Sequence, residues 1–172
     1  MRRRTGGTGL RRRRMRRKPG GGGGWGLGRA SRRGIEGVLA GRNWSKAGGA
    51  SGTAIASLVE TCKYPLPNDY LWFLRLSNGG DGPLSVDPLW LCIYSAESVE
   101  DYARSGLEEE HHPGLFVIGS NSGGEYIAFD FRDDGEGKLV YFDGVAGEES
   151  SEPLAESFSD LISLLEAEDS TP

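Results

Sequence analysis

Two segments contain residue types that suggest chemistry, and the first is the string GSNSG at residues 119–123. It is similar to the Gly-x-Ser-x-Gly turn that exposes a nucleophilic serine between a strand and a helix. Asn121 occupies the central position, so the hydroxyls of Ser120 and Ser122 lie beside the position that the chemistry needs. The spacing therefore predicts a turn, and no catalytic residue is assigned here.

The second segment begins at Asp130 with the letters DFRDDG, like a calcium-binding loop. Arg132 stands at the third position, where an oxygen ligand is needed. Tyr141 stands where a bidentate glutamate should close the loop. The segment therefore predicts an ordinary loop between strands.

The remaining candidates for metal binding or catalysis are two histidines and two cysteines. His111 and His112 are adjacent in a polar stretch, and the sequence has no other histidine. Cys62 and Cys92 are separated by 30 positions and show no paired-ligand spacing. We expect a solvated histidine pair, two free buried thiols, and no metal or cofactor. A histidine-based enzyme would need partners from distant segments.

Acidic side chains are the most abundant charged groups after the first 48 residues. Residues 49–172 contain twenty-four Asp and Glu against five Lys and Arg, a net charge of −19. A field of one sign attracts partners of the opposite charge and speeds association. The candidate contact residues lie near predicted glycine turns: Asp81, Asp87, Glu125, Asp133, Asp134 and Glu136. Trp72, Trp90 and Tyr94 would serve as anchors if exposed, and core packing is their alternative role.

The elements that carry these residues follow from the spacing of apolar side chains. Helical spacing is found at residues 53–62, from Pro67 to a stop at Gly79 and Gly80, at 95–104 and at 157–165. Strand patterns are found at residues 89–93, 115–119, 126–131 and 139–142. The short connections favour adjacent antiparallel strands. The fold class is therefore α+β, with a mostly antiparallel sheet packed by N- and C-terminal helices.

The first 48 residues differ from the rest in composition. They contain fifteen Lys and Arg against one acid, largely in arginine and glycine runs. This composition predicts a disordered tail over residues 1–48, a domain over 49–168, and a second tail over 169–172. The arginine runs would bind nucleic acid through phosphates, or they arise from translation upstream of a native start near Asn43. No apolar run has the length of a membrane span, so we expect a cytoplasmic protein with no membrane partner.

Four strings, taken in order, resemble the SUKH superfamily, which includes the Smi/Knr cell-wall regulators and many bacterial immunity proteins. LPNDYLWFLRLSNGG at residues 66–80 is similar to its helix and glycine stop. FVIGSNSGGEYIAFDFR at 116–132, LVYFDG at 139–144 and SFSDLISLL at 157–165 resemble its later strands and closing helix. The resemblance covers about residues 50 to 166.

The resemblance implies binding rather than catalysis. Bacterial members neutralise toxins that are encoded beside them, and fungal members act as scaffolds in cell-wall signalling. The family has no common catalytic residue, so only scaffold positions transfer: Leu66, Pro67, Tyr70, Phe73, Leu74, Asn78, Gly79, Gly80, Gly123, Gly124 and Phe158. We expect a non-enzymatic immunity protein that binds a cationic toxin domain such as a nuclease. The alternatives are a Smi/Knr-type scaffold, nucleic-acid binding through the tail, and an enzyme that uses His111 or His112.

Overall fold

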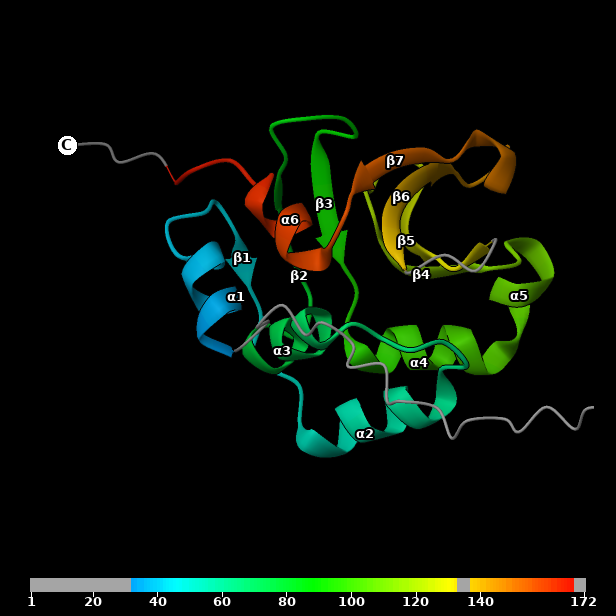
Figure 1. The fold of residues 1–172 in the computed structure, drawn as a ribbon, viewed down its shortest axis with the longest axis horizontal. Coiled ribbons are helices and arrows are strands. Elements are labelled where there is room, and N and C mark those ends of the chain that lie inside the picture. Colours follow the sequence, from blue (N-terminus) through cyan, green and yellow to red (C-terminus); the bar gives the residue numbers. More distant parts are fainter. Residues whose placement is uncertain (1–31, 133–136, 169–172) are drawn as a thin grey trace, which may run out of the picture.

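The strands form one antiparallel sheet in which spatial order follows chain order (Figure 1). The computed structural model describes residues 32–132 and 137–168. Within them the strands are β1 (Ser45–Lys46), β2 (Gly80–Pro83), β3 (Trp90–Ile93), β4 (Leu115–Ser120), β5 (Glu125–Asp130), β6 (Lys138–Asp143) and β7 (Glu152–Ala155). Every neighbouring pair is antiparallel, which confirms the predicted α+β class and its antiparallel sheet.

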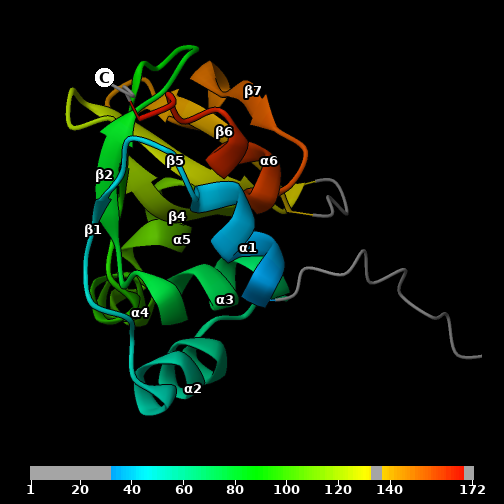
Figure 2. The same cartoon turned by 90° about the vertical axis from the view of Figure 1, so that its left-hand side faces the viewer.

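Helices from both the N-terminal and the C-terminal parts of the described chain pack on the sheet. They are α1 (Arg32–Leu39), α2 (Gly52–Thr61), α3 (Asn68–Leu76), α4 (Ala96–Ser105), α5 (Leu107–His111) and α6 (Phe158–Ser163), with a short 3-10 turn, η2 (Glu148–Ser150). Figure 2 shows α1, α3 and α6 together on one side of the sheet. The polar stretch around α5 was expected to be a loop. Its helical turn instead continues from α4 after Gly106, which takes a left-handed conformation at φ +73°.

The two faces of the sheet carry different clusters because strand side chains alternate. The larger cluster lies under the helices, where Phe158 packs 5.1 Å from both Tyr70 and Phe73, measured between ring centroids. The smaller cluster is made by Leu115, Val117, Ala128, Val140 and Phe142, bordered by Tyr94, Tyr102 and Tyr126. We call this second surface the tyrosine face.

The ends of α3 differ from the prediction. Pro67 lies just before the helix with extended backbone (ψ 140°), and Ser77 ends it with φ −146°. The buried Ser77 hydroxyl donates to the Gly79 carbonyl at 2.5 Å and accepts the Ala47 amide at 3.1 Å, so the chain turns directly toward the sheet. Gly79 and Gly80 therefore lie beyond the end of the helix, where the chain enters β2, and do not cap the helix.

Two apolar segments are less buried than predicted. Val59 of α2 is 46% exposed, because this helix contacts the core mainly through Ile55 and Leu58. The segment 89–93 was expected to be buried throughout, yet Leu89 is 61% exposed and Trp90 39% exposed. Only alternate residues of β3 point toward the helices, so its other residues belong to the tyrosine face.

Residues 32–48 fold onto the domain, although their composition placed them in the tail. Ile35 of α1 is fully buried against the helix cluster, and β1 pairs with β2. The Asn43 amide donates to the Glu166 carbonyl at 2.8 Å, which joins this segment to the C-terminal end of the fold. The predicted boundary at residue 49 is therefore too late. The predicted tails over residues 1–31 and 169–172 lie outside the described residues.

Candidate partner-binding surface

The predicted acidic contact residues do not form one site. Asp81 pairs directly with Cys92 in the sheet, so the two side chains lie on the same face. This is the tyrosine face, because Tyr94 follows Cys92 by two positions. Asp87 and Glu125 lie elsewhere, beside Tyr141. The other three predicted residues, Asp133, Asp134 and Glu136, lie outside the described residues.

Tyr141 is the centre of a separate acidic region on the helix side of the sheet. Burial raises the pKa of its phenol, and the carboxylates of Asp87, Glu152 and Glu125 raise that pKa further. Glu125 also accepts a hydrogen bond from the Asn121 side chain at 2.6 Å. Carboxylates from three separate segments therefore act electrostatically on this tyrosine.

The GSNSG string forms the turn between β4 and β5, as predicted. The side-chain oxygen of Asn121 accepts the Gly123 amide at 2.8 Å and the Glu125 amide at 3.1 Å. Asparagine suits this position because its amide group replaces a backbone partner inside a tight turn. Asn121, which occupies the position of the nucleophilic serine in the Gly-x-Ser-x-Gly pattern, thus stabilises the hairpin turn.

A cavity of about 360 Å³ opens on the tyrosine face. Its walls are Tyr94, Ser98, Val99, Tyr102, Val117 and Tyr126. A second cavity of about 440 Å³ adjoins it, because Tyr102 and Tyr126 line both. The second cavity is completed by His111, His112 and the loop at residues 144–148. We call the two together the tyrosine groove; of its residues, only Tyr94 was predicted from the sequence as a partner anchor.

Burial affects the ionisation of one tyrosine in the groove wall, Tyr94, and of the nearby thiol of Cys92. Burial raises the pKa of Tyr94, against the opposing effect of a hydrogen bond from Ser120. Burial also raises the pKa of Cys92, and the Asp81 carboxylate adds to this effect. Cys62 and Cys92 form no disulfide within the described residues, and both are half-buried rather than buried as predicted. Cys92 belongs to the tyrosine face, because it alternates along β3 with the buried Leu91 and Ile93.

The predicted solvated histidine pair is wrong for His112. Its side chain is only 6% exposed and packs edge-on against Phe142, with ring centroids 4.8 Å apart. Its Nδ1 atom has no hydrogen-bond partner within the described residues. The chain passes inward between α5 and β4 at this point, so one histidine is buried while its neighbour His111 stays exposed.

We predict that His112 makes the fold less stable in mild acid. Burial lowers its pKa, the Glu148 carboxylate opposes this, and His111 lowers the pKa further. In the unfolded chain this histidine has a pKa of about 6.5, so it binds a proton below that pH, whereas the folded chain does so only near its lower pKa. The free energy of unfolding therefore falls as the pH drops from about 6.5 toward the folded pKa. Urea unfolding at pH 7.5, 6.5 and 5.5 should show this loss, and His112→Phe should reduce it. His111→Gln, at the exposed position, should retain most of it; equal slopes in wild type and His112→Phe would contradict the prediction.

The scaffold residue Asn78 positions one wall of the groove. Its side-chain oxygen accepts the Ala96 amide and its amide donates to the Glu97 carboxylate, both at 2.7 Å. The bond from Asn78 is also the main reason why the pKa of Glu97 is lowered. These contacts hold the first turn of α4, which continues into the groove residues Ser98 and Tyr102.

Other scaffold residues are buried or shape the turns. Tyr70, Phe73, Leu74 and Phe158 are fully buried, Gly79 is buried, and Leu66, Pro67 and Gly80 are half-buried. Gly123 and Gly124 are exposed in the turn between β4 and β5. The sequence missed Asp69, whose buried carboxylate accepts the Ser159 amide at 2.8 Å and its hydroxyl at 2.9 Å. Its position in the first turn of α3 was visible, but its partner lies 90 residues away.

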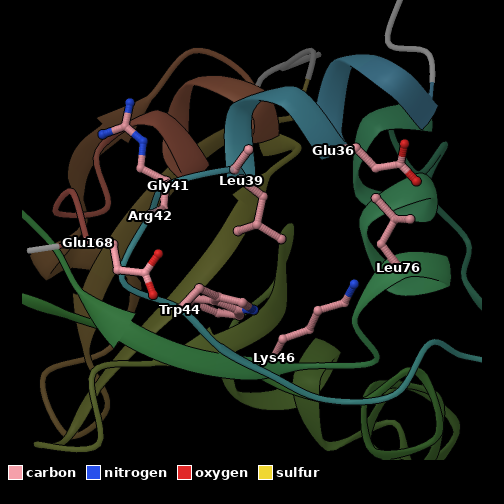
Figure 3. A pocket seen from close by; sticks show the side chains of 9 residues that line it. Glu36, Leu39, Gly41, Arg42, Trp44, Lys46, Leu76 and Glu168 are labelled. Atoms are coloured by element: carbon pink, nitrogen blue, oxygen red, sulfur yellow. The ribbon is translucent and has the colours of Figure 1, made fainter. Parts of the chain in front are cut away.

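A further cavity of about 300 Å³ lies between α1, β1 and the C-terminal segment (Figure 3). Trp44 and Lys46 line it from one side and Leu39 from another, with Glu36 and Glu168 at its edges. Arg42, which also lines it, donates to the Leu165 carbonyl at 2.7 Å. Because the walls carry charges of both signs, this cavity does not favour a ligand of either charge.

The model of the SMI1 / KNR4 family (SUKH-1) matches residues 49–164. The chain belongs to this family. The match runs from just before α2 to just past the end of α6, so it contains every element of the tyrosine groove. Helix α1 and strand β1 precede the SUKH-1 match and pack onto it. The comparison with curated proteins found no match for this chain.

The SUKH-1 assignment confirms the resemblance drawn from the four strings. It identifies a family of domains and names no partner for this member. Among the described residues, no helix has the length and apolar character needed to cross a membrane.

Proposed function

We propose that this SUKH-1 chain is a non-enzymatic module that binds a basic protein in the cytoplasm, and that this partner is a toxin domain which it neutralises. The observation that supports the proposal is an imbalance of free charge. Residues 76–172 contain twenty-two Asp and Glu and three Lys and Arg. All three cationic side chains form ion pairs within the fold.

Each of these pairs neutralises a cation with a carboxylate of the same chain. Arg132 donates two hydrogen bonds to the Asp130 carboxylate, from Nε to Oδ1 at 3.0 Å and from an Nη atom to Oδ2 at 2.7 Å. Arg104 pairs with Glu100, and Lys138 pairs with Glu156 at 2.6 Å. The remaining carboxylates are therefore poorly compensated. Such a field attracts a cationic surface and raises its rate of association, most strongly at low salt.

The tyrosine face provides the part of this acidic surface best suited to protein contact. Trp90 is exposed there, and Tyr94, Tyr102 and Tyr126 are half-buried. Aromatic side chains contribute large contact areas at little cost in conformational entropy and dominate binding hot spots. Trp72, the third predicted anchor, instead packs against the helix-side core with Arg75 4.8 Å above its ring.

A regulatory scaffold of the SMI1/KNR4 type is the second candidate, because it would use the same surface on an endogenous protein. The identity of the partner distinguishes the scaffold function from the immunity function. Binding to a toxin encoded beside this gene would support the immunity function. Nucleic-acid binding through residues 2–18 is less well supported, because phosphates would be repelled by the acidic residues after position 75. Those basic residues lie outside the described part of the chain.

The experiment tests binding of the full chain to each product of the neighbouring genes, expressed individually. Titration calorimetry at 50 and 300 mM salt should give a dissociation constant that rises at least tenfold with salt. The variant D81N/D101N/E148Q, which removes charge around the tyrosine face, should weaken binding at least tenfold. The matched variant E60Q/D160N/E166Q, which removes the same charge elsewhere, should weaken it about threefold or less.

Two results would overturn the proposal. One is a tight complex whose affinity is unchanged by salt and by both variants, which would exclude the acidic surface. The other is the absence of binding to any neighbouring product while an endogenous regulatory protein binds, which would favour the scaffold. Protection of cells from the bound toxin by the full chain, and its loss with D81N/D101N/E148Q, would support neutralisation directly.

A further inference from the structure

We propose that the first cavity of the tyrosine groove, the one lined by Tyr94, Tyr102 and Tyr126, is a receptor for one arginine side chain of the basic partner. This inference rests on the proposed function and identifies the chemical group that its surface recognises. This cavity lies between α4 and the strands β4 and β5. Tyr102 belongs to α4, Tyr126 belongs to β5, and Tyr94 directly follows β3. Nothing in the SUKH-1 match assigns a ligand to this position.

The walls of the groove match the parts of an arginine side chain. Tyr94, Tyr102 and Tyr126 offer aromatic rings, whose faces attract a cation. Val99 and Val117 offer apolar surface for the methylene stem. The phenol oxygens and the Ser98 hydroxyl are hydrogen-bond acceptors for the guanidinium, which is a donor only.

The size of the cavity favours a single side chain. Its volume of about 360 Å³ lies near the lower end of the range for ligand sites, about 300–1,000 Å³. The adjoining cavity at His111 and Glu148 leaves room for neighbouring residues of the partner. A planar guanidinium stacks on tyrosine and is weakly hydrated, whereas a lysine ammonium is compact and strongly hydrated. Arginine is therefore preferred over lysine.

The charges around the groove exclude an anionic occupant. Glu97 and Asp101 precede the groove residues Ser98 and Tyr102 on α4, and both are exposed. Glu148 lines the adjoining cavity. The single cation of α4, Arg104, is held by Glu100, which also accepts the Ser57 hydroxyl at 2.7 Å. A cationic side chain that enters the groove thus meets carboxylates with no competing cation on this helix.

The test uses the full chain with carbon-13 in its tyrosine rings and three tripeptides with blocked ends. The central residue is arginine, lysine or citrulline, which keeps the shape of arginine without the charge. Titration by NMR should shift the ring signals of Tyr94, Tyr102 and Tyr126 with saturation by the arginine peptide. The lysine peptide should bind at least threefold more weakly, and citrulline should produce no saturable shift.

Variants at Tyr102 separate ring stacking from a general loss of structure. Tyr102→Ala should reduce arginine-peptide affinity at least fivefold, and Tyr102→Phe, which keeps the ring, should change it less than threefold. Tyr141 is the internal control, because carboxylates influence it outside the groove. If arginine and lysine peptides shift Tyr141 as much as Tyr102, simple charge attraction explains the result and the proposal is wrong. Unchanged signals of Tyr141 in each variant show that the fold is intact.

The outcomes distinguish this inference from the proposed function. The peptide titration needs no partner, so a missing toxin leaves its result unaffected. If the full chain binds the product of a neighbouring gene and Tyr102→Ala leaves that affinity unchanged, the arginine site is overturned and the protein-binding function stands. If the arginine peptide produces no saturable shift in the groove, the site is overturned as well.

Discussion

Gly80→Ala is expected to lower the free energy of unfolding by about 3 to 6 kcal/mol. Gly80 has φ +136°, a conformation that residues with a side chain rarely adopt. An added Cβ would lie 2.4 Å from the Ser45 carbonyl oxygen and 2.8 Å from the Trp44 ring. Because one obstacle is the backbone of a paired strand, β1 would have to leave β2.

Urea unfolding followed by tryptophan fluorescence measures this effect, with Gly124→Ala as the matched control. Gly124 also has a positive φ, +110°, but a Cβ added there would meet no atom within 4 Å. Its replacement should cost only the backbone strain, about 1 to 2 kcal/mol. Equal losses for the two variants would show that the contact with β1 contributes nothing.

Asp69→Ala is expected to lower the free energy of unfolding by about 3 kcal/mol. The carboxylate is 6% exposed and joins the start of α3 to the start of α6. One oxygen accepts the amide and hydroxyl of Ser159, and the other accepts the Tyr70 amide at 3.0 Å. Hydrogen bonds to a charged acceptor contribute about 1.5–3 kcal/mol each, and alanine leaves their donors without this partner.

The matched control is Asp160→Ala in the same helix as Ser159. Asp160 is exposed and accepts a bond from the Ser157 hydroxyl at 2.6 Å, so its removal should cost less than about 1 kcal/mol. Asp69→Asn keeps an acceptor of similar shape and should lie between the two. The proposed role of Asp69 is wrong if urea unfolding gives the same loss for Asp69→Ala and Asp160→Ala.

Elements with a long apolar repeat were predicted with their correct type. Leu58, Phe73 and Leu161 each fall on a helical stripe, and each is fully buried. The strands β1, β2 and β7 were not predicted, because their short sequences, SK, GDGP and EPLA, show neither an apolar run nor an alternating pattern. Helix α1 had a visible stripe in Ile35, Val38 and Leu39, but the surrounding arginines and glycines dominated its composition.

The candidate site was predicted less completely than the fold. The excess of acidic charge and one groove residue, Tyr94, were evident from the sequence. Tyr102 and Tyr126 gave no local signal, because they come together only when α4 packs beside the sheet. Among the predicted acids that the structure describes, Asp81 lies on the tyrosine face, whereas Glu125 precedes Tyr126 in β5 and points to the other face, since successive strand residues point in opposite directions.

The sequence by itself determined the fold class, the family and the sign of the surface charge. Those properties depend on local periodicity, on motif order and on composition, which need no knowledge of distant contacts. Only the tertiary structure decided that His112 is buried, that Asp69 reaches Ser159, and that three tyrosines share one groove. Each of these depends on segments far apart in the chain, and their approach is set by packing of the whole core.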